Sequence, residues 1–305
     1  MRLAFIKTLS EFVRKNKNTI LLTGDVGFSV FEDFIKEFPG QYINCGVAEQ
    51  NMLGVAAGLA LSGKKVFVYS IIPFVTMRPY EQLRNDICLQ NLDVKIVGVG
   101  GGFSYGVLGS THHALEDLAI TRALPNLTVV VPADPIETKL AVGAITKLKG
   151  PVYLRLGKSK EEDVHRGLFK FGIGKANILK TGKDAVIIGI GPIIKNALIA
   201  ANILKKEAGV SLGVVSMTTL KPLDEGFVKS VAKRAKSIFT IEEHNLIGGL
   251  GDAVAAVLLK NRFRGIFEKL GVSDRFAGVI GNQDFLRSRN NLSPREIAKF
   301  VGKNL

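Results

Sequence analysis

Short runs of apolar and β-branched residues alternate with helical patterns along almost the whole chain, and this alternation limits the possible folds most strongly. We predict strands at residues 19–24, 65–70, 94–99, 127–132 and 151–156. These runs are apolar nearly throughout, which is typical of strands with helices on both faces of their sheet. The sequence therefore predicts an α/β protein built on a parallel sheet.

The alternation stops once and then restarts. A polar passage rich in Gly and Lys occupies residues 157–184, and the strand-like runs DAVIIGIG, VSLGVVS and SIFTIEE follow it. A chain of 305 residues is long enough for two cores. We expect two consecutive parallel-sheet α/β domains, at residues 1–165 and 185–305, joined by a linker at residues 166–184.

The composition argues against several classes of protein. No window has the roughly 18 uninterrupted apolar residues of a membrane span, and the N-terminal residues predict an amphipathic helix rather than a signal peptide. The lysines behind the net charge of +14 are dispersed and there is no Trp, so we expect no nucleic-acid partner. Cys45 and Cys88 lack metal-ligand spacing and predict reduced thiols in a cytoplasmic protein.

The segments that directly follow the predicted strands are where chemistry is expected. In open parallel sheets, ligands bind beyond the carboxyl ends of the strands. These segments are residues 24–29, 45–50, 70–74, 100–113 and 155–159, and several of them are rich in glycine.

Glu49 lies in the first turn of an almost purely apolar predicted helix. One interpretation is a carboxylate stabilised by the free N–H groups of the helix start. The other is a carboxylate held where water is scarce, able to share a proton with a bound heterocycle. The stretch alone leaves both open.

Two adjacent histidines, His112 and His113, follow the glycine-rich segment, and with Thr111 they are predicted to open a helix. The chain has no HExxH motif and no Cys/His cluster, so we expect no metal site built from this chain alone. One of the histidines is expected to act as an acid–base or hydrogen-bonding group toward a substrate. Phe74, after a strand end, could stack on a flat ring or pack in the core.

A second glycine-rich run, GGLGDAV, enters a predicted helix after the strand that ends in Ile241-Glu242-Glu243-His244. Glycines there suit a tight turn against a neighbouring backbone. Anion binding at the helix start and packing between subunits both remain open.

Three long blocks carry a resemblance to a known family. They are GVAEQNMLGVAAGLALSGKKVFV, THHALEDLAITRALPNLTVVVPAD, and TLKPLD followed by TIEEHNLIGGLGDAV. They resemble, in order, the pyrimidine-binding domain and the C-terminal domain of thiamine-diphosphate enzymes of the transketolase type. The resemblance extends from near residue 2 to about residue 285.

The resemblance implies roles around the cofactor thiamine diphosphate. A glutamate at the position of Glu49 hydrogen-bonds N1′ of the aminopyrimidine in this family and favours the imino tautomer that takes the C2 proton. Phe74 falls where an aromatic residue stacks on the aminopyrimidine, with Tyr69 and Tyr80 as the other candidates. Asp25 matches an aspartate near the cofactor and the subunit contact.

The resemblance also implies substrate contacts. His112 matches a histidine that contacts substrate oxygen atoms near the reacting carbons, and His113 is a second candidate whose separate role stays open. Arg2, Ser29 and Arg155 resemble residues that hold the substrate phosphate, for which guanidinium groups are well suited.

Two departures from the family pattern concern the substrate. Leu108 stands where transketolases carry an aspartate that contacts a donor hydroxyl, and Gly100 to Gly102 replace the region of a phosphate-contacting histidine. An apolar group cannot accept a hydrogen bond, and an unpaired hydroxyl costs roughly 1–3 kcal/mol. We therefore expect substrates other than the standard pentose and hexose phosphates.

One motif of a complete transketolase is missing from the chain. There is no Gly-Asp-Gly, and the adjacent pair Asn290-Asn291 lies near the C-terminus. In the family, a Gly-Asp-Gly motif and an Asn-Asn pair that follows it hold Mg²⁺ and the diphosphate. The resemblance thus implies the C-terminal subunit of a split enzyme, whose N-terminal, diphosphate-binding partner supplies most of the Mg²⁺ site, within an α2β2 assembly.

Three functional interpretations follow from the sequence. The first is a pyrimidine-binding subunit of a split transketolase that moves a two-carbon ketol unit from a ketose to an aldose. The second is the β subunit of a 2-oxo acid dehydrogenase, or a deoxyxylulose-phosphate synthase-like enzyme. The third is a non-catalytic scaffold subunit, which the departures at Leu108 and the glycine run favour and which Glu49 and His112 argue against.

Overall fold

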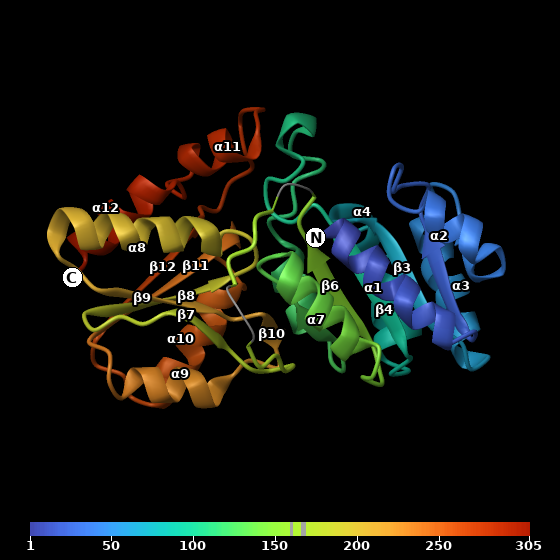
Figure 1. Cartoon of the computed structure of the whole chain (residues 1–305), viewed down its shortest axis with the longest axis horizontal. Helices are drawn as coiled ribbons and strands as arrows, with labels where there is room; N and C mark the ends of the chain where they lie inside the picture. The colour runs from blue at the N-terminus through green and yellow to red at the C-terminus, as the bar shows by residue number, and fades with distance from the viewer. Residues whose placement is uncertain (159–160, 166–168) are drawn as a thin grey trace.

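Two twisted sheets lie side by side in the computed structural model, each with helices on both faces (Figure 1). The structure describes residues 1–158, 161–165 and 169–305. The strands are β1 (Thr19–Thr23), β2 (Tyr42–Asn44), β3 (Lys65–Ile71), β4 (Val94–Val99), β5 (Thr128–Val130), β6 (Val152–Leu156), β7 (Asn177–Lys180), β8 (Ala185–Ile190), β9 (Leu212–Ser216), β10 (Thr219–Lys221), β11 (Ser237–Asn245) and β12 (Ile266–Val272).

Helices separate most of these strands, as the alternating pattern predicted. In the first unit they are α1 (Arg2–Lys15), α2 (Glu32–Glu37), α3 (Glu49–Leu61), α4 (Ile72–Thr76), α5 (Tyr80–Gln82), α6 (Asp117–Ala123) and α7 (Pro135–Ile145), with the 3₁₀ turns η1 (Pro39–Gln41) and η3 (Gly106–Leu108) and the π-helix η2 (Leu83–Cys88). In the second unit they are α8 (Ile194–Ala208), α9 (Glu225–Ala232), α10 (Leu250–Lys260), α11 (Gln283–Arg289) and α12 (Pro294–Lys303).

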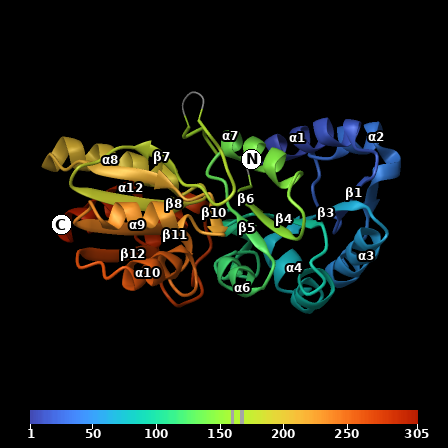
Figure 2. The same cartoon turned by 90° about the horizontal axis from the view of Figure 1, so that it is seen from below.

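The first sheet has the strand order β10-β5-β6-β4-β3-β1-β2. All its pairs are parallel except the one between β10 and β5. Helices α1, α2 and α7 cover one face, and α3, α4 and α6 cover the other (Figure 2). Because both faces are covered, strands β1, β4 and β6 are buried at every residue. The predicted α/β class and the five predicted strands are confirmed.

The second sheet has the order β12-β11-β8-β9-β7, with β7 antiparallel to β9 and the other pairs parallel. Helices α8 and α12 pack together on one face, and α9 and α10 lie on the other (Figure 1). This arrangement confirms a second α/β unit after the first.

One strand of the second unit forms the edge of the first sheet. Strand β10 belongs by sequence to the second unit but pairs with β5 of the first sheet. Strand β7 lies inside the segment that we predicted to be a linker, so the second unit begins earlier than expected, whereas residues 166–168 of that segment lie outside the described residues. Short polar strands such as NILK carry too weak an alternating pattern to be seen in the sequence.

One predicted helix start is wrong. Thr111 and His112 lie in a turn, His113 is outside any helix, and helix α6 begins only at Asp117. The backbone of Ala114 exchanges two hydrogen bonds with Gly102, each of 3.0 Å, in an isolated antiparallel bridge. An extended residue held in this way cannot belong to a helix that starts at Thr111.

No helix in the described part of the chain is both long enough and apolar enough to cross a membrane. Both cysteines are free. The cytoplasmic location stays a prediction.

Candidate active site

The loops that follow β1, β2, β3 and β4 lie at one edge of the first sheet. These strands form parallel pairs in the order β4-β3-β1-β2, so their carboxyl ends point the same way. The parallel sheet thereby brings the predicted site segments together, although they are far apart in the sequence.

Glu49 is the first residue of α3 and only 3 % of its surface is exposed. Its Oε2 accepts a hydrogen bond from Arg78 Nη1 at 3.1 Å, and its Oε1 lies 3.5 Å from Ser70 Oγ. A Cβ atom added to Gly24 would lie 3.4 Å from Oε1, so the chain passes close to the carboxylate. Glu49 is therefore a buried carboxylate that one half-exposed cation reaches.

Phe74 and Arg78 lie beside this carboxylate, after the end of β3. The guanidinium carbon of Arg78 stands 4.0 Å from the centre of the Phe74 ring. The Arg78 side chain is 47 % exposed, whereas that of Glu49 is 2 % exposed. Arg78 thus stacks on an aromatic face and donates to a buried carboxylate at the same time.

His112 is the next member of the cluster. Its ring lies 5.1 Å from that of Phe74, edge to face, and 6.3 Å from that of Tyr105. Its Nδ1 is 3.0 Å from Thr111 Oγ1. Burial, and then the charge of Arg78, lower the pKa of the imidazole below 6.5. His112 is therefore a neutral hydrogen-bonding group at pH 7.

His113 points elsewhere. It is 4 % exposed, packs edge to face on Phe103 at 5.2 Å, and places Nε2 3.4 Å from the carbonyl oxygen of Gly106. Its Nδ1 has no hydrogen-bond partner among the described residues, and burial lowers its pKa. The structure separates the two histidines and leaves His112 with Phe74.

Of the two tyrosines considered beside Phe74, Tyr69 is buried and Tyr80 is partly buried. Tyr69 is 1 % exposed and packs edge to face on Phe31 at 4.7 Å. Tyr80 donates its hydroxyl to the carbonyl of Ile120 at 2.9 Å. Among these three rings, Phe74 is the one that packs on His112 and on Arg78, the cation paired with Glu49.

Asp25 and Ser29 lie in the exposed loop after β1, and both have positive φ angles, of 55° and 62°. Asp25 accepts a 2.9 Å hydrogen bond from Asn44 Nδ2. The backbone N–H of Ser29 donates to Glu32 Oε1 at 2.6 Å. Roles for these two side chains remain predictions.

Arg2 is the first residue of α1 and donates from Nε to the carbonyl of Lys158. Lys158 in turn places its ammonium 4.5 Å from the centre of the Tyr105 ring. Two cations thus lie on the side of Tyr105, the ring that also neighbours His112. The proposed phosphate contact of Arg2 remains a prediction that this placement supports.

Arg155 has a different environment from the one that we expected. It is 3 % exposed, and its Nε and Nη2 donate to Asp117 at 2.8 and 3.2 Å. Nη2 also donates to the carbonyls of Ala114 and Glu243. Arg155 is thus held by Asp117 in a buried ion pair, and the phosphate contact expected for it remains a prediction.

The glycine run after β4 is required by close packing. A Cβ atom at Gly100, where φ is +96°, would lie 2.2 Å from the Tyr105 ring, and one at Gly102, where φ is +63°, would lie 2.5 Å from the Glu243 carboxyl. Leu108, by contrast, is 49 % exposed. A histidine could not replace these glycines without moving their neighbours.

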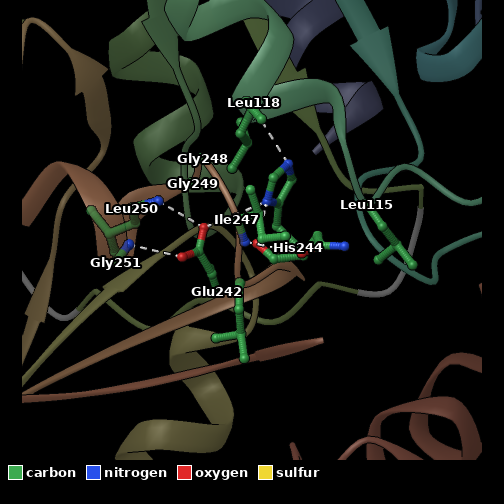
Figure 3. A network of polar contacts seen from close by, with 12 residues as sticks. Leu115, Leu118, Glu242, His244, Ile247, Gly248, Gly249, Leu250 and Gly251 are labelled. Carbon is green, nitrogen blue, oxygen red and sulfur yellow. Dashed lines mark hydrogen bonds and ion pairs between the residues drawn. The ribbon is translucent and has the colours of Figure 1, made fainter. Parts of the chain in front are cut away.

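The start of α10 is occupied by a carboxylate of the chain itself (Figure 3). Glu242 accepts the backbone N–H groups of Leu250 at 2.7 Å and Gly251 at 2.8 Å. Burial raises the pKa of this carboxyl to about 7 despite these bonds. His244 packs nearby, with Nδ1 2.7 Å from the carbonyl of Asn245. The anion site considered for the GGLGDAV run is therefore filled internally.

The sequence interpretation missed Arg78 and Tyr105. Arg78 follows Phe74 by four residues, and this spacing brings two side chains together on one face of a helical turn. That spacing was the available signal for Arg78. Within the described residues, no group of three or more His, Cys, Asp or Glu side chains is arranged to hold a metal ion.

Family models match both units of the chain. The transketolase pyrimidine-binding domain matches residues 1–162, and the transketolase C-terminal domain matches residues 174–296. The chain belongs to the transketolase family, and it corresponds to the C-terminal section of a split enzyme of this type.

Individual relatives agree with this assignment. The chain is similar to one subunit of the apulose-4-phosphate transketolase of Phocaeicola vulgatus, at 40 % identity over 85 % of this chain and 84 % of the relative. It is also similar to a subunit of the 6-deoxy-6-sulfo-D-fructose transketolase of Clostridium sp., at 34 % identity over 98 % and 92 % of the two chains. A solved split-gene transketolase, described as an inactive β4 tetramer, superposes with a TM-score of 0.91 at 38 % identity, covering 100 % of this chain and 97 % of the other.

Proposed function

We propose that this chain supplies the aminopyrimidine side of a thiamine-diphosphate site in a ketol-transferring enzyme. The observation that carries the proposal is that a buried carboxylate, Glu49, and the face of an aromatic ring, Phe74, both contact one planar group, the Arg78 guanidinium. An aminopyrimidine offers a flat face and polar ring atoms in one plane. A stacking partner must lie above the flat face, whereas a hydrogen-bond partner of a ring nitrogen must lie in the plane of the ring.

The side chain of Arg78 supports this fit because it acts as an internal stand-in. The guanidinium is planar and carries N–H donors, and it lies 4.0 Å over the Phe74 ring while donating to Glu49 at 3.1 Å. A flat, N–H-bearing group thus already satisfies both partners together. The residues present fit the aminopyrimidine by the same geometry.

The proposed chemistry divides between the cofactor and the chain. Thiamine diphosphate supplies the electron sink for transfer of a two-carbon unit. Glu49 holds a proton at the ring nitrogen, in a place where its 3 % exposure excludes water. His112, neutral at pH 7 and in contact with Phe74, donates or accepts hydrogen bonds at the substrate oxygens.

The diphosphate and Mg²⁺ are proposed to be held mainly by a partner chain. The sequence lacks a Gly-Asp-Gly motif, and the two transketolase relatives from Phocaeicola vulgatus and Clostridium sp. are themselves subunits of larger enzymes. We propose a second, diphosphate-binding polypeptide and an α2β2 assembly with the site at their junction.

The substrates proposed are a ketose donor and an aldose acceptor that differ from the standard pairs. The side chain of Leu108 cannot accept a hydrogen bond from a hydroxyl group of the ketose donor. The packed glycines leave no room for a histidine. The same two relatives are named for apulose 4-phosphate and for a sulfonated ketose. A substrate panel should therefore include branched, sulfonated and phosphorylated ketoses.

Co-purification tests the proposal first. The tagged chain is isolated from its native lysate, its partners are identified, and bound thiamine diphosphate is assayed. A partner carrying Gly-Asp-Gly, with cofactor bound to the pair and ketol transfer in the panel, supports the proposal. A chain that emerges alone and binds no cofactor with added Mg²⁺ would contradict it and favour the scaffold interpretation. Release of CO₂ from pyruvate would favour the dehydrogenase or synthase interpretation.

A further inference from the structure

We propose that Arg78 is a placeholder: it occupies the aminopyrimidine position in the chain by itself and must leave when the cofactor binds. The inference rests on the proposed function and assigns a task to a residue that the proposed chemistry does not use. It makes Arg78 a determinant of cofactor affinity rather than a catalytic residue.

Both contacts of Arg78 coincide with those proposed for the cofactor ring. The guanidinium covers the Phe74 face at 4.0 Å and holds Glu49 Oε2 at 3.1 Å. An aminopyrimidine cannot stack on the same face, or bond to the same oxygen, while the guanidinium remains there. The two occupants therefore exclude each other.

Glu49 needs a partner whenever the cofactor is absent. The carboxylate is almost fully buried, and a buried charge without a partner is strongly unfavourable. Its other polar contact, with Ser70 Oγ, is long at 3.5 Å. Among the described residues, Arg78 is the cation that forms an ion pair with it.

Arg78 is also able to leave. Its side chain is 47 % exposed, and Glu49 is its only ion-pair partner in the described part of the chain. Because the guanidinium already reaches water, the long side chain can move into solvent once the cofactor ring takes over its contact with Glu49. The competition lowers the apparent affinity for the cofactor by the fraction of chains in which the site is open.

The test measures thiamine diphosphate binding to the full chain in Mg²⁺, by titration calorimetry, with the partner present and absent. Arg78→Ala is expected to bind roughly 3- to 30-fold more tightly than the wild type, since the ion pair with Glu49 and the cation–π contact with Phe74 no longer compete. Arg78→Gln, which keeps the length but not the charge, is expected to fall between them. Thermal unfolding checks that each variant is folded.

Arg14→Ala is the matched control. Arg14 pairs with Glu37 and lies 6.0 Å from the centre of the Phe38 ring, so these contacts involve neither Glu49 nor Phe74. This variant should bind the cofactor like the wild type.

The placeholder role would be overturned if folded Arg78→Ala bound thiamine diphosphate no more tightly than the wild type. It would also be overturned if neither the wild type nor the variant bound the cofactor detectably. Glu49→Gln separates this failure from failure of the proposed function. If only the placeholder is wrong, Glu49→Gln still weakens binding while Arg78→Ala does not strengthen it. If the proposed function is wrong, neither change alters cofactor binding.

Discussion

Asp117 Oδ2 lies 2.8 Å from Arg155 Nε, and the two side chains are 0 % and 3 % exposed. The same carboxylate oxygen accepts the hydroxyl of Tyr153 at 2.6 Å. Arg155 also reaches the carbonyl of Glu243 in the second unit. A buried ion pair of the first unit thus contributes directly to the junction between the units.

Asp117→Asn is expected to destabilise the chain by about 3–5 kcal/mol, because it leaves the buried Arg155 charge without its partner. Urea unfolding followed by circular dichroism measures this loss. Glu225→Gln breaks the exposed pair with Lys229 and serves as the control, with an expected loss below about 1 kcal/mol. Similar losses of stability in the two variants would show that the buried pair stabilises the chain no more than the exposed pair does.

Glu49→Gln is expected to reduce ketol transfer by the reconstituted enzyme at least about 100-fold, because an amide cannot share a proton with the ring nitrogen as a carboxyl group does. Initial rates with the best donor and acceptor of the panel measure the effect. Glu37→Gln, at the exposed pair with Arg14, should keep the wild-type rate. Full activity of Glu49→Gln would argue for a non-catalytic scaffold.

Stability should depend on pH through His165. Its Nδ1 lies 2.8 Å from Asp134 and its Nε2 lies 3.1 Å from Glu137, and its ring stacks on Phe169 at 4.1 Å. Burial alone would lower the pKa of His165, but the hydrogen bonds and charges of the two carboxylates outweigh it and raise the pKa from 6.5 to about 9.

Because the folded chain keeps a proton that the unfolded chain releases, the stabilisation is complete below pH 6.5 and is lost as the pH rises through about 9. Urea unfolding at about pH 6, 7.5 and 9 measures how far the free energy of unfolding declines. His165→Gln should flatten this dependence. A wild-type decline no steeper than that of the variant would contradict the assignment.

The pKa of His112 should report on Arg78. Burial lowers it first and the Arg78 charge lowers it further. Arg78→Ala is therefore expected to raise the pKa of His112 toward 6.5, as followed by the ring protons in an NMR titration. The pKa of His113, which is lowered mainly by burial, should change less. An unchanged pKa of His112 would show that Arg78 lies away from the imidazole in solution.

Local patterns predicted much of the fold. The five strands of the first unit and the helix after Glu49 were visible because each is a compact run with its own periodicity. The helix expected at Thr111 and the linker that contains β7 were wrong because a long-range backbone bridge and an antiparallel edge pairing decided them.

The sequence by itself determined the α/β class, the transketolase resemblance and the place of Glu49 at the start of a helix. Those properties depend on residues close together in the chain. Only the tertiary structure decided which side chains meet: Arg78 on Phe74 and Glu49, His113 away from His112, and Arg155 buried on Asp117. Such choices follow from burial and charge pairing between distant segments, which no local pattern records.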